Sequence, residues 1–286
     1  MTALNSKSLT QYPSGSVKEV AKISLPLILS SLSMSLMIFI DRYILAQYSI
    51  EAMNSAVSAG MACFVFSIGL IGITGIAEVF VGQYNGKGEK QRLGEPVWQM
   101  IWFALASTIL FVPLALFAGH IMVPSAFHDQ GLPYFRWVMA FGPLFAMVPA
   151  VAAFFIGQGK VKIVLASVVA GNVVNAILDW LLVFGFSDII PSLGTEGAAI
   201  ATVVSQFLQV GILLCVFLNK KNRTHCGTTK VAIQKNLMKS CLYIGTPASI
   251  GHMVEISAWA LLMHMMAGVS SVHMTVLVIG QSFHAL

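Results

Sequence analysis

The chain has 286 residues, of which 57% are hydrophobic and only 9% are charged. Soluble domains are about 45–50% apolar and about 25% charged, so this composition excludes a soluble enzyme, a nucleic-acid-binding domain and a disordered protein. The net charge of +5 does not indicate a nucleic-acid partner, because membrane proteins carry extra Lys and Arg for topological reasons. We therefore predict an all-α integral membrane protein embedded in a lipid bilayer.

Uncharged apolar runs along the chain predict the membrane helices. Residues 1–20 are polar and lack the apolar segment of a cleaved signal peptide, so we expect the first span itself to direct insertion. Seven runs follow, at residues 23–40, 52–77, 97–121, 137–159, 163–178, 197–218 and 241–254. An eighth begins at Met274 and reaches the end of the chain after 13 residues. A span needs about 20 residues, so we expect this last span to be cut short.

Basic residues gather in alternate connections between these runs. The N-terminal arm and the connections after the second, fourth and sixth runs hold 14 of the 16 Lys and Arg residues. The positive-inside rule then predicts a cytoplasmic N-terminus and a cytoplasmic connection at residues 219–240, and we expect a location in the cell (inner) membrane. The four cysteines form no CxxC pair, so we predict neither disulfides nor a cysteine-based zinc site.

Comparison of the chain with itself at an offset of 221 residues indicates an internal repeat. Identical pairs at this offset are Lys18 with Lys239, Ile23 with Ile244, Pro26 with Pro247, Ala46 with Ala267, Ser49 with Ser270, Met53 with Met274, and Val57 with Val278. We predict two parallel lobes related by a pseudo-twofold axis along the membrane normal. The expected units are a six-helix lobe at 1–218, a linker at 219–240 and a truncated second lobe at 241–286. Two complete units would need roughly 440 residues.

Three acidic residues follow apolar runs at depths where charges are expensive and mark functional sites. At about 1.5 Å per helical residue, Asp41 lies ~27 Å, Asp179 ~24 Å and Glu255 ~21 Å from the inner boundary. All three therefore fall in the outer half of a hydrocarbon core of about 30 Å. Thr202, counted from the opposite side, falls at a similar depth. We expect four helices to bring these groups to one cavity open toward the exterior.

The spacing around two of these residues indicates an oxygen-rich site. Asn175 and Asp179 share a helix face four residues apart, as do Ala198 and Thr202. A carboxylate, an amide oxygen, a hydroxyl and a backbone carbonyl suit a hard cation such as Na⁺. Buried carboxylates can bind a proton instead. The expected coupling ion is therefore Na⁺ or H⁺, and no other cofactor is predicted.

Several segments resemble the MATE (multidrug and toxic compound extrusion) transporters. They are the first run with Pro26 and Asp41, VGQYNGKG at the exit of the second, GNVVNAILDW in the fifth and LGTEGAAIAT in the sixth. The seventh run, with Gly245-x-Pro247 and Glu255, resembles the NorM-type branch. The resemblance extends from about residue 17 to the end of the chain. It implies twelve helices in two six-helix lobes and export of cationic compounds against Na⁺ or H⁺.

The resemblance also implies roles for individual residues. The amino-lobe cation site of the family falls on Asp41, Asn175, Asp179, Ala198 and Thr202, and its carboxy-lobe acid falls on Glu255. Two residues depart from the family pattern, since Lys87 stands where a small residue is usual and Glu78 where an apolar one is usual. The remaining helices of the second lobe, with any partner of Glu255, are expected beyond this chain.

Simpler interpretations stand beside these assignments. Asp41 could pair with Arg42, and Asp179 could cap its span at the interfacial aromatic belt beside Trp180. Asn175 and Thr202 could be interhelical hydrogen bonds. Glu255 has no visible partner in the sequence, and Glu78 is expected at the membrane interface. The four histidines after residue 250 show no metal-ligand spacing and are expected to pack or lie at the interface.

The predicted function is secondary active multidrug efflux, in which cationic or amphipathic small molecules are exchanged for Na⁺ or H⁺. We expect a full-length monomer that is not an enzyme. Two alternatives stay open: a flippase of the same superfamily that moves a lipid-linked oligosaccharide, and a non-transporting fragment. A membrane-embedded enzyme would need a DDxxD metal motif or a Ser/His/Asp set, and the sequence indicates neither.

Overall fold

The computed structural model describes residues 16–186 and 189–284. These residues are almost entirely helical, and an isolated bridge between Phe186 and Ile190 is the extent of their β-structure. In chain order the helices are α1 (Val17–Tyr48), α2 (Ile50–Gly75), α3 (Ala77–Gly86), α4 (Gly94–Ala106), α5 (Thr108–Phe117), α6 (Gly119–Met122), α7 (His128–Ala140), α8 (Gly142–Ile156), α9 (Val161–Phe184), α10 (Gly194–Phe217), α11 (Lys220–Cys226), α12 (Lys235–Val269) and α13 (Ser271–His284). Short 3-10 turns lie at Lys90–Arg92 and Ser125–Phe127.

Six helical segments in the described part of the chain are long and apolar enough to cross a membrane. Two of them combine neighbouring helices, α2 with α3 and α4 with α5. A bent pair, Ser125–Ala140 with Gly142–Ile156, makes a seventh span with a 41° break. The apolar helix α13 is shorter. This confirms the predicted all-α membrane fold, with a short helix after seven spans.

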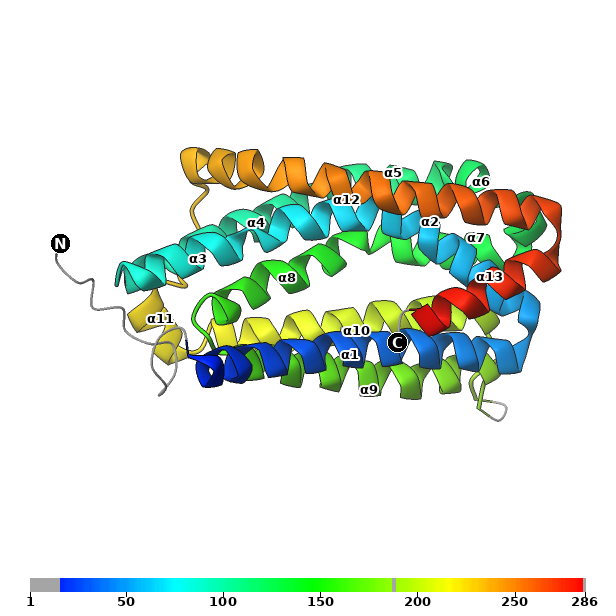
Figure 1. The fold of residues 1–286 in the computed structure, drawn as a ribbon, viewed down its shortest axis with the longest axis horizontal. Coiled ribbons are helices and arrows are strands. Elements are labelled where there is room, and N and C mark those ends of the chain that lie inside the picture. The colour runs from blue at the N-terminus through cyan, green and yellow to red at the C-terminus, as the bar shows by residue number, and fades with distance from the viewer. Residues whose placement is uncertain (1–15, 187–188, 285–286) are drawn as a thin grey trace.

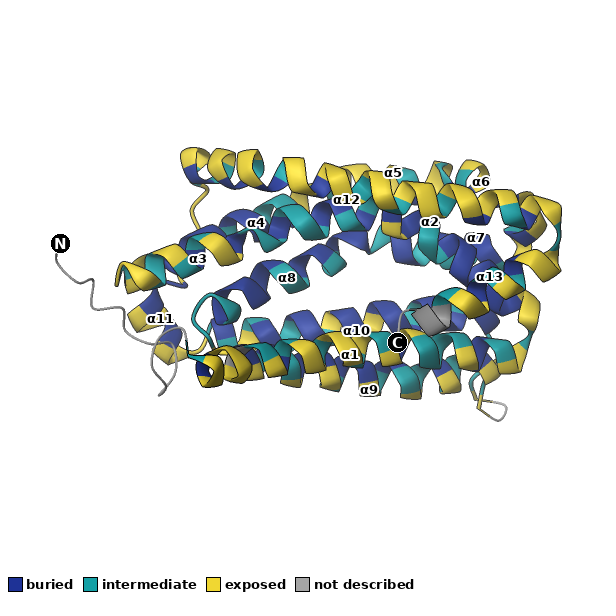
Figure 2. Cartoon of the chain, viewed as in Figure 1, coloured by how far each residue is buried: buried dark blue, intermediate teal, exposed yellow. Residues whose placement is uncertain are grey.

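Helices α1, α2, α7, α8, α9 and α10 pack into one bundle around an apolar core, and α12 lies along α2 (Figure 1). Glycines allow α2 and α12 to approach closely, as in many membrane helix pairs. A Cβ placed on Gly72 would collide with the hydroxyl of Ser249, and one on Gly69 with the sulfur of Met253. Buried residues face the inside of the bundle, whereas much of the outer surface of α1 and α12 is exposed (Figure 2).

The corners after α1 and α12 have the same geometry 221 residues apart. Each helix is followed by an extended serine, Ser49 at φ −165° and ψ 148° and Ser270 at φ −170° and ψ 158°. Each serine hydroxyl accepts a hydrogen bond from the backbone N–H three residues on, from Ala52 at 2.9 Å and from His273 at 3.4 Å. The repeat found in the sequence is therefore present in the hydrogen bonding of the fold.

The connection before α12 is folded onto α4, and we call residues 227–234 the strap. Helix α11 precedes the strap, and α12 begins at Lys235, six residues before the start of its apolar run. The indole N–H groups of Trp98 and Trp102 donate to the carbonyls of Thr228 and Val231, each at 2.8 Å. Two aromatic side chains of α4 therefore hold the strap by its backbone.

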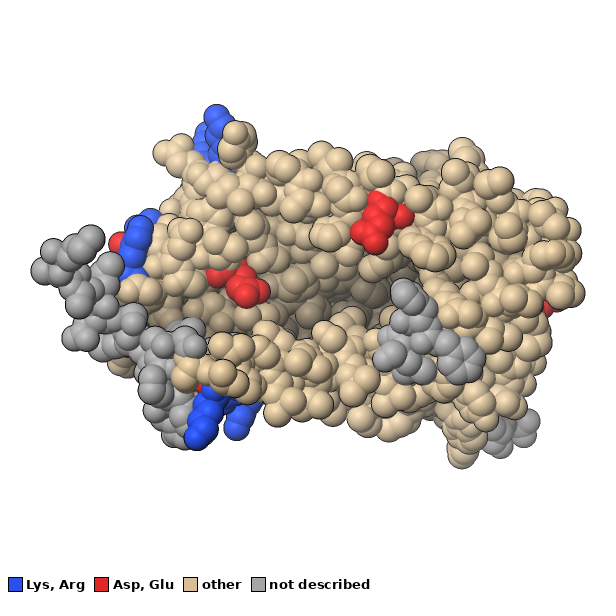
Figure 3. All heavy atoms as spheres, viewed as in Figure 1, with Lys and Arg blue, Asp and Glu red and all other residues tan. Residues whose placement is uncertain are grey.

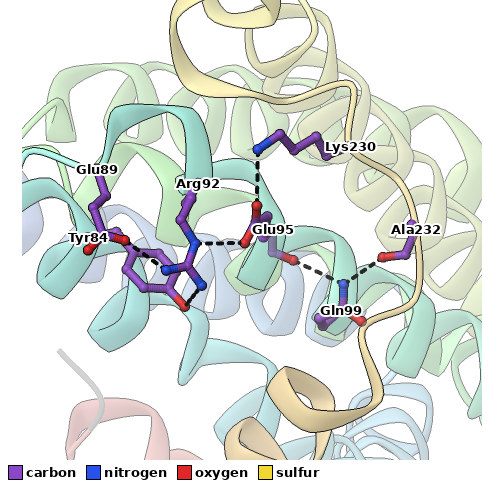
Figure 4. A network of polar contacts seen from close by, with 7 residues as sticks. All are labelled: Tyr84, Glu89, Arg92, Glu95, Gln99, Lys230 and Ala232. Atoms are coloured by element: carbon purple, nitrogen blue, oxygen red, sulfur yellow. Dashed lines mark hydrogen bonds and ion pairs between the residues drawn. The ribbon is translucent and has the colours of Figure 1, made fainter.

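Polar side chains around α4 complete this attachment (Figure 4). The amide of Gln99 donates to the carbonyl of Ala232 at 3.0 Å and accepts from the backbone N–H of Gln234 at 2.9 Å. Glu95 forms ion pairs with Lys230 of the strap at 3.2 Å and with Arg92 at 3.1 Å. The strap therefore has a defined path that fixes where α12 begins.

Lys and Arg side chains gather at one end of the molecule (Figure 3). This end carries the α3–α4 and α8–α9 connections and α11, and we call it the basic end. The opposite end carries the two serine corners (Figure 1), and we call it the far end.

Candidate functional site

One face of α9 carries the polar side chains Asn172, Asn175 and Asp179 in an otherwise apolar helix. Their spacing of three and four residues places them on one side of the helix, which packs between α1 and α10. Asn175 and Asp179 are 0% exposed, whereas the neighbouring Trp180 is 57% exposed. Asp179 therefore points into the bundle, and the interpretation that it caps the span at the membrane surface is wrong.

Helix α1 supplies a second carboxyl group. The side-chain amide of Asn172 donates to the carbonyl and to the hydroxyl of Ser33, at 2.9 and 2.8 Å, and these bonds fix α1 against α9. Nearer the far end, the carboxyl group of Asp41 lies close to that of Asp179. The two acids lie at one level although 138 residues separate them in the sequence.

Buried polar atoms without partners distinguish this group, which we call the carboxylate cluster (Asp41, Asn175 and Asp179). Within the described residues, no hydrogen bond reaches Oδ1 of Asp41, either amide atom of Asn175 or either carboxylate oxygen of Asp179. An unpaired buried polar group costs roughly 1–3 kcal/mol, and a charged one costs more. A hard cation ligated by these oxygens, or a proton shared by the two carboxyls, would supply the missing partner. The residues present fit either ion.

Helix α10 places Thr202 near the level of this cluster. The antiparallel pair α9 and α10 meets closely where Gly197 packs on the backbone of Leu182. Thr202 and Asp179 each lie about one turn inward from that contact. The hydroxyl of Thr202 donates to the carbonyl of Ala198 at 2.9 Å, so its oxygen lone pairs are what it can offer a cation.

Sequence spacing did not identify Tyr134 of α7 as a neighbour of the cluster. Its ring faces Gly60 on α2, and its phenol lies close enough to interact electrostatically with Asp41 and Asp179. Tyr134 is remote from both acids in the chain and follows Pro133 in a helix with mixed polarity. Only the packing of α7 against α2 and α10 brings it to the cluster.

Two side-chain hydrogen bonds join α13 to the first lobe at the far end, and we call them the far-end clamp. The guanidinium of Arg42 donates to Gln281 at 3.0 Å, and the amide of Asn54 donates to the hydroxyl of Thr275 at 2.8 Å. Arg42 also lies near Asp41, so it connects the surroundings of that acid to the second lobe. Pairing with Asp41 alone does not describe it.

The structure does not bring Glu255 to the carboxylate cluster. Glu255 lies on α12, which packs chiefly on α2, and its side chain is 67% exposed. The ring nitrogen Nδ1 of His252 is 3.8 Å from its carboxylate. The expectation of one cavity lined by all four groups therefore fails for Glu255, because α12 packs on α2 and not on α9 or α10. Glu78 on α3 is exposed as well, and acidic side chains lie at the margin of a hollow in this face of the molecule (Figure 3).

No group of three or more His, Cys, Asp or Glu side chains that could hold a metal ion lies within the described ranges. His273 hydrogen-bonds the hydroxyl of Ser270 at 2.7 Å and so belongs to the second serine corner. The side chain of His284 lies outside the described residues.

The family model MatE matches residues 26–181, which is more than half of the chain and includes Asp41, Asn175 and Asp179. The chain belongs to the MATE family. Members of this family are membrane transporters of small molecules and not enzymes. The "Probable multidrug resistance protein NorM" of Thermotoga maritima is 22% identical over 242 residues, which cover 83% of this chain and 52% of that protein.

Solved MATE structures share the fold. The eukaryotic MATE transporter AtDTX14 is 21% identical and superposes with a TM-score of 0.71, over 87% of this chain and 56% of that one. An outward-facing multidrug resistance MATE transporter is 17% identical, with a TM-score of 0.70 over 87% of this chain and 55% of that one. The chain thus spans about half the length of the relatives that it matches.

Proposed function

We propose that this chain supplies the first lobe and the start of the second lobe of a secondary active exporter. The exporter exchanges cationic or amphipathic small molecules for Na⁺ or H⁺ across the cell membrane, with the basic end in the cytoplasm. The observation that carries this proposal is the carboxylate cluster, because its buried oxygens lack partners that a cation or proton would supply. Membership of a transporter family supports the same direction.

The cluster connects ion binding to helix position. With no cation, the carboxylates of Asp41 and Asp179 repel each other across the α1–α9 contact. A bound cation or proton removes this repulsion and holds α1 against α9. Arg42 is next to Asp41 and bonded to Gln281, so a shift of α1 reaches α13. Coupling of this kind is reciprocal, and an ion that favours one arrangement weakens substrate binding in that arrangement.

Ion binding can be tested on the chain itself, because all ligands of the proposed site lie within it. We expect NaCl, compared with choline chloride, or a decrease in pH to raise the thermal stability of the purified chain. The variants Asp41→Asn and Asp179→Asn should lose the response to whichever ion acts. Asp129→Asn, in the first turn of α7 at the far end, is the matched control and should keep it. An undiminished response in both cluster variants would overturn the site.

Transport itself needs a separate measurement. We expect ethidium efflux from cells that express the protein to follow the gradient of the ion identified above and to fall in both cluster variants. Ion binding without efflux by residues 1–286 alone would identify a non-transporting fragment with an intact ion site. The flippase alternative is less well supported, because the matched relatives are named as multidrug transporters. Preferential binding of polyprenyl-diphosphate lipid over cationic dyes would reverse this ranking.

A further inference from the structure

A pocket of about 670 Å³ lies at the basic end, away from the carboxylate cluster. Three separate segments line it: the α3–α4 connection, the α8–α9 connection and α11. Direct bonds hold these segments together, since Asn85 donates to the carbonyl of Gly157 at 3.3 Å and Gln91 donates to the carbonyl of Thr224 at 2.7 Å. The pocket is therefore built by the fold and is not a loose surface loop.

The charge of the pocket is mostly positive. Its charged lining residues are Lys90, Lys160, Lys221, Arg92 and Glu89. Arg92 is balanced by ion pairs with Glu89 at 2.8 Å and with Glu95. The three lysines form no ion pair with a described residue. One segment each contributes a lysine, so three like charges converge without an acidic partner.

The buried thiol of Cys226 reports this convergence. Cys226 lines the pocket, and Lys160 and Lys90 both lie near enough to stabilise its thiolate. Burial outweighs them and raises the pKa of the thiol above its ordinary value. Helix α9 begins directly after Lys160, and no side chain caps its first turn, so the positive end of a 24-residue helix is added at the pocket wall.

We propose that this pocket binds the phosphate group of an anionic phospholipid headgroup. Free phosphate shares this chemistry, but the position favours a lipid. Lys90 and Lys160 lie at the start of the membrane-spanning segments Lys90–Phe117 and Val161–Phe184, which is the depth at which lipid phosphates lie. Basic pockets at this depth bind anionic headgroups, and each Lys near the surface strengthens binding by about 1 kcal/mol, or roughly fivefold. This inference does not depend on the identity of the coupling ion.

The test is native mass spectrometry of the purified chain titrated with dioleoylphosphatidylglycerol, dioleoylphosphatidylcholine or inorganic phosphate. We expect preferential binding of the phosphatidylglycerol, weakened about fivefold by Lys160→Gln and at least tenfold, in rough terms, by the triple change of Lys90, Lys160 and Lys221 to Gln. The control carries Lys162→Gln, Lys220→Gln and Lys235→Gln, which remove equal charge at the same end but outside the pocket. The control should bind like the parent.

The outcomes separate the sources. Equal loss in the pocket and control variants would overturn the pocket, because it would show attraction to surface charge in general. Competition by inorganic phosphate with no preference for phosphatidylglycerol would overturn the lipid assignment. A second readout uses a variant in which Ala replaces Cys63, Cys215 and Cys241. Phosphatidylglycerol should slow alkylation of Cys226 in that variant, and unchanged alkylation at saturating lipid would contradict the proposal.

Discussion

Two asparagines on one face of α9 have opposite roles at the level of the single residue. Asn172 uses its amide N–H to hold Ser33 of α1. Asn175, one turn further along the helix, is fully buried, and neither of its amide atoms has a partner among the described residues. The first residue therefore stabilises the fold, whereas the second lowers stability and is available to an ion.

This contrast gives a paired prediction. Asn172→Leu should destabilise the chain by about 1–3 kcal/mol, because it removes made hydrogen bonds and leaves their partner unpaired. Asn175→Leu should leave stability unchanged or raise it, since it replaces orphaned polar atoms by an apolar group of similar size. Thermal unfolding in detergent measures both. Only Asn175→Leu should abolish the ion response, and a large loss of stability in that variant would contradict the assignment.

At the level of secondary structure, the contact between α2 and α12 depends on the absence of a side chain at particular points. Gly72 faces the hydroxyl of Ser249, which is held by its own hydrogen bond to the carbonyl of Gly245 at 2.8 Å. Gly75, on the same helix, has open space where a Cβ would stand. The two glycines therefore differ in packing while sharing one helix.

We expect Gly72→Ala to destabilise the α2–α12 contact by about 1–3 kcal/mol through overpacking. Gly75→Ala should be neutral or stabilising, because Ala is the better helix former by up to about 1 kcal/mol. Thermal unfolding compares the variants directly. Equal effects at the two positions would show that helix propensity and not close approach governs this contact.

The strap is the other element with a testable attachment. Gln99→Leu removes both of its bonds to the strap, and Trp102→Phe removes the bond to Val231 while keeping most of the ring. Hydrogen exchange at residues 228–234 should accelerate in each variant, and trypsin should cut faster at Lys230. Trp180→Phe, on an exposed position of α9, is the control. Unchanged exchange in both strap variants would mean that the ion pair of Glu95 with Lys230 is sufficient.

For the whole molecule, the far-end clamp fixes how the second lobe begins to pack on the first. We expect Asn54→Cys with Thr275→Cys to form a disulfide under mild oxidation, because their side-chain ends are 2.8 Å apart. Trypsin cleavage at the strap followed by a non-reducing gel would show the two halves still linked. Asn54→Cys with Val272→Cys should not link, since Val272 is 68% exposed. Linkage in the control alone would contradict the clamp.

Much of this architecture could be predicted from the sequence, because apolar length and Lys/Arg alternation depend on the bilayer and not on details of packing. The 221-residue repeat and the shared depth of Asp41 and Asp179 followed from counting along helices. Glu255 and Tyr134 could not be placed in this way. Depth along a helix does not say which face a residue occupies or which helix packs beside it, and those properties come only from contacts such as α12 on α2.

The bond between Asn54 and Thr275 has a consequence for the ancestry of the fold. At the twofold axis of a homodimer, a residue meets its own copy. Asn54 meets the residue 221 positions later, which is its copy in the second repeat. If the first 221 residues assembled as a pair of separate subunits, Asn54 would therefore face Asn54 across the axis. Fusion of the two subunits frees the two positions to diverge, and an amide opposite a hydroxyl gives this contact one defined donor and one acceptor.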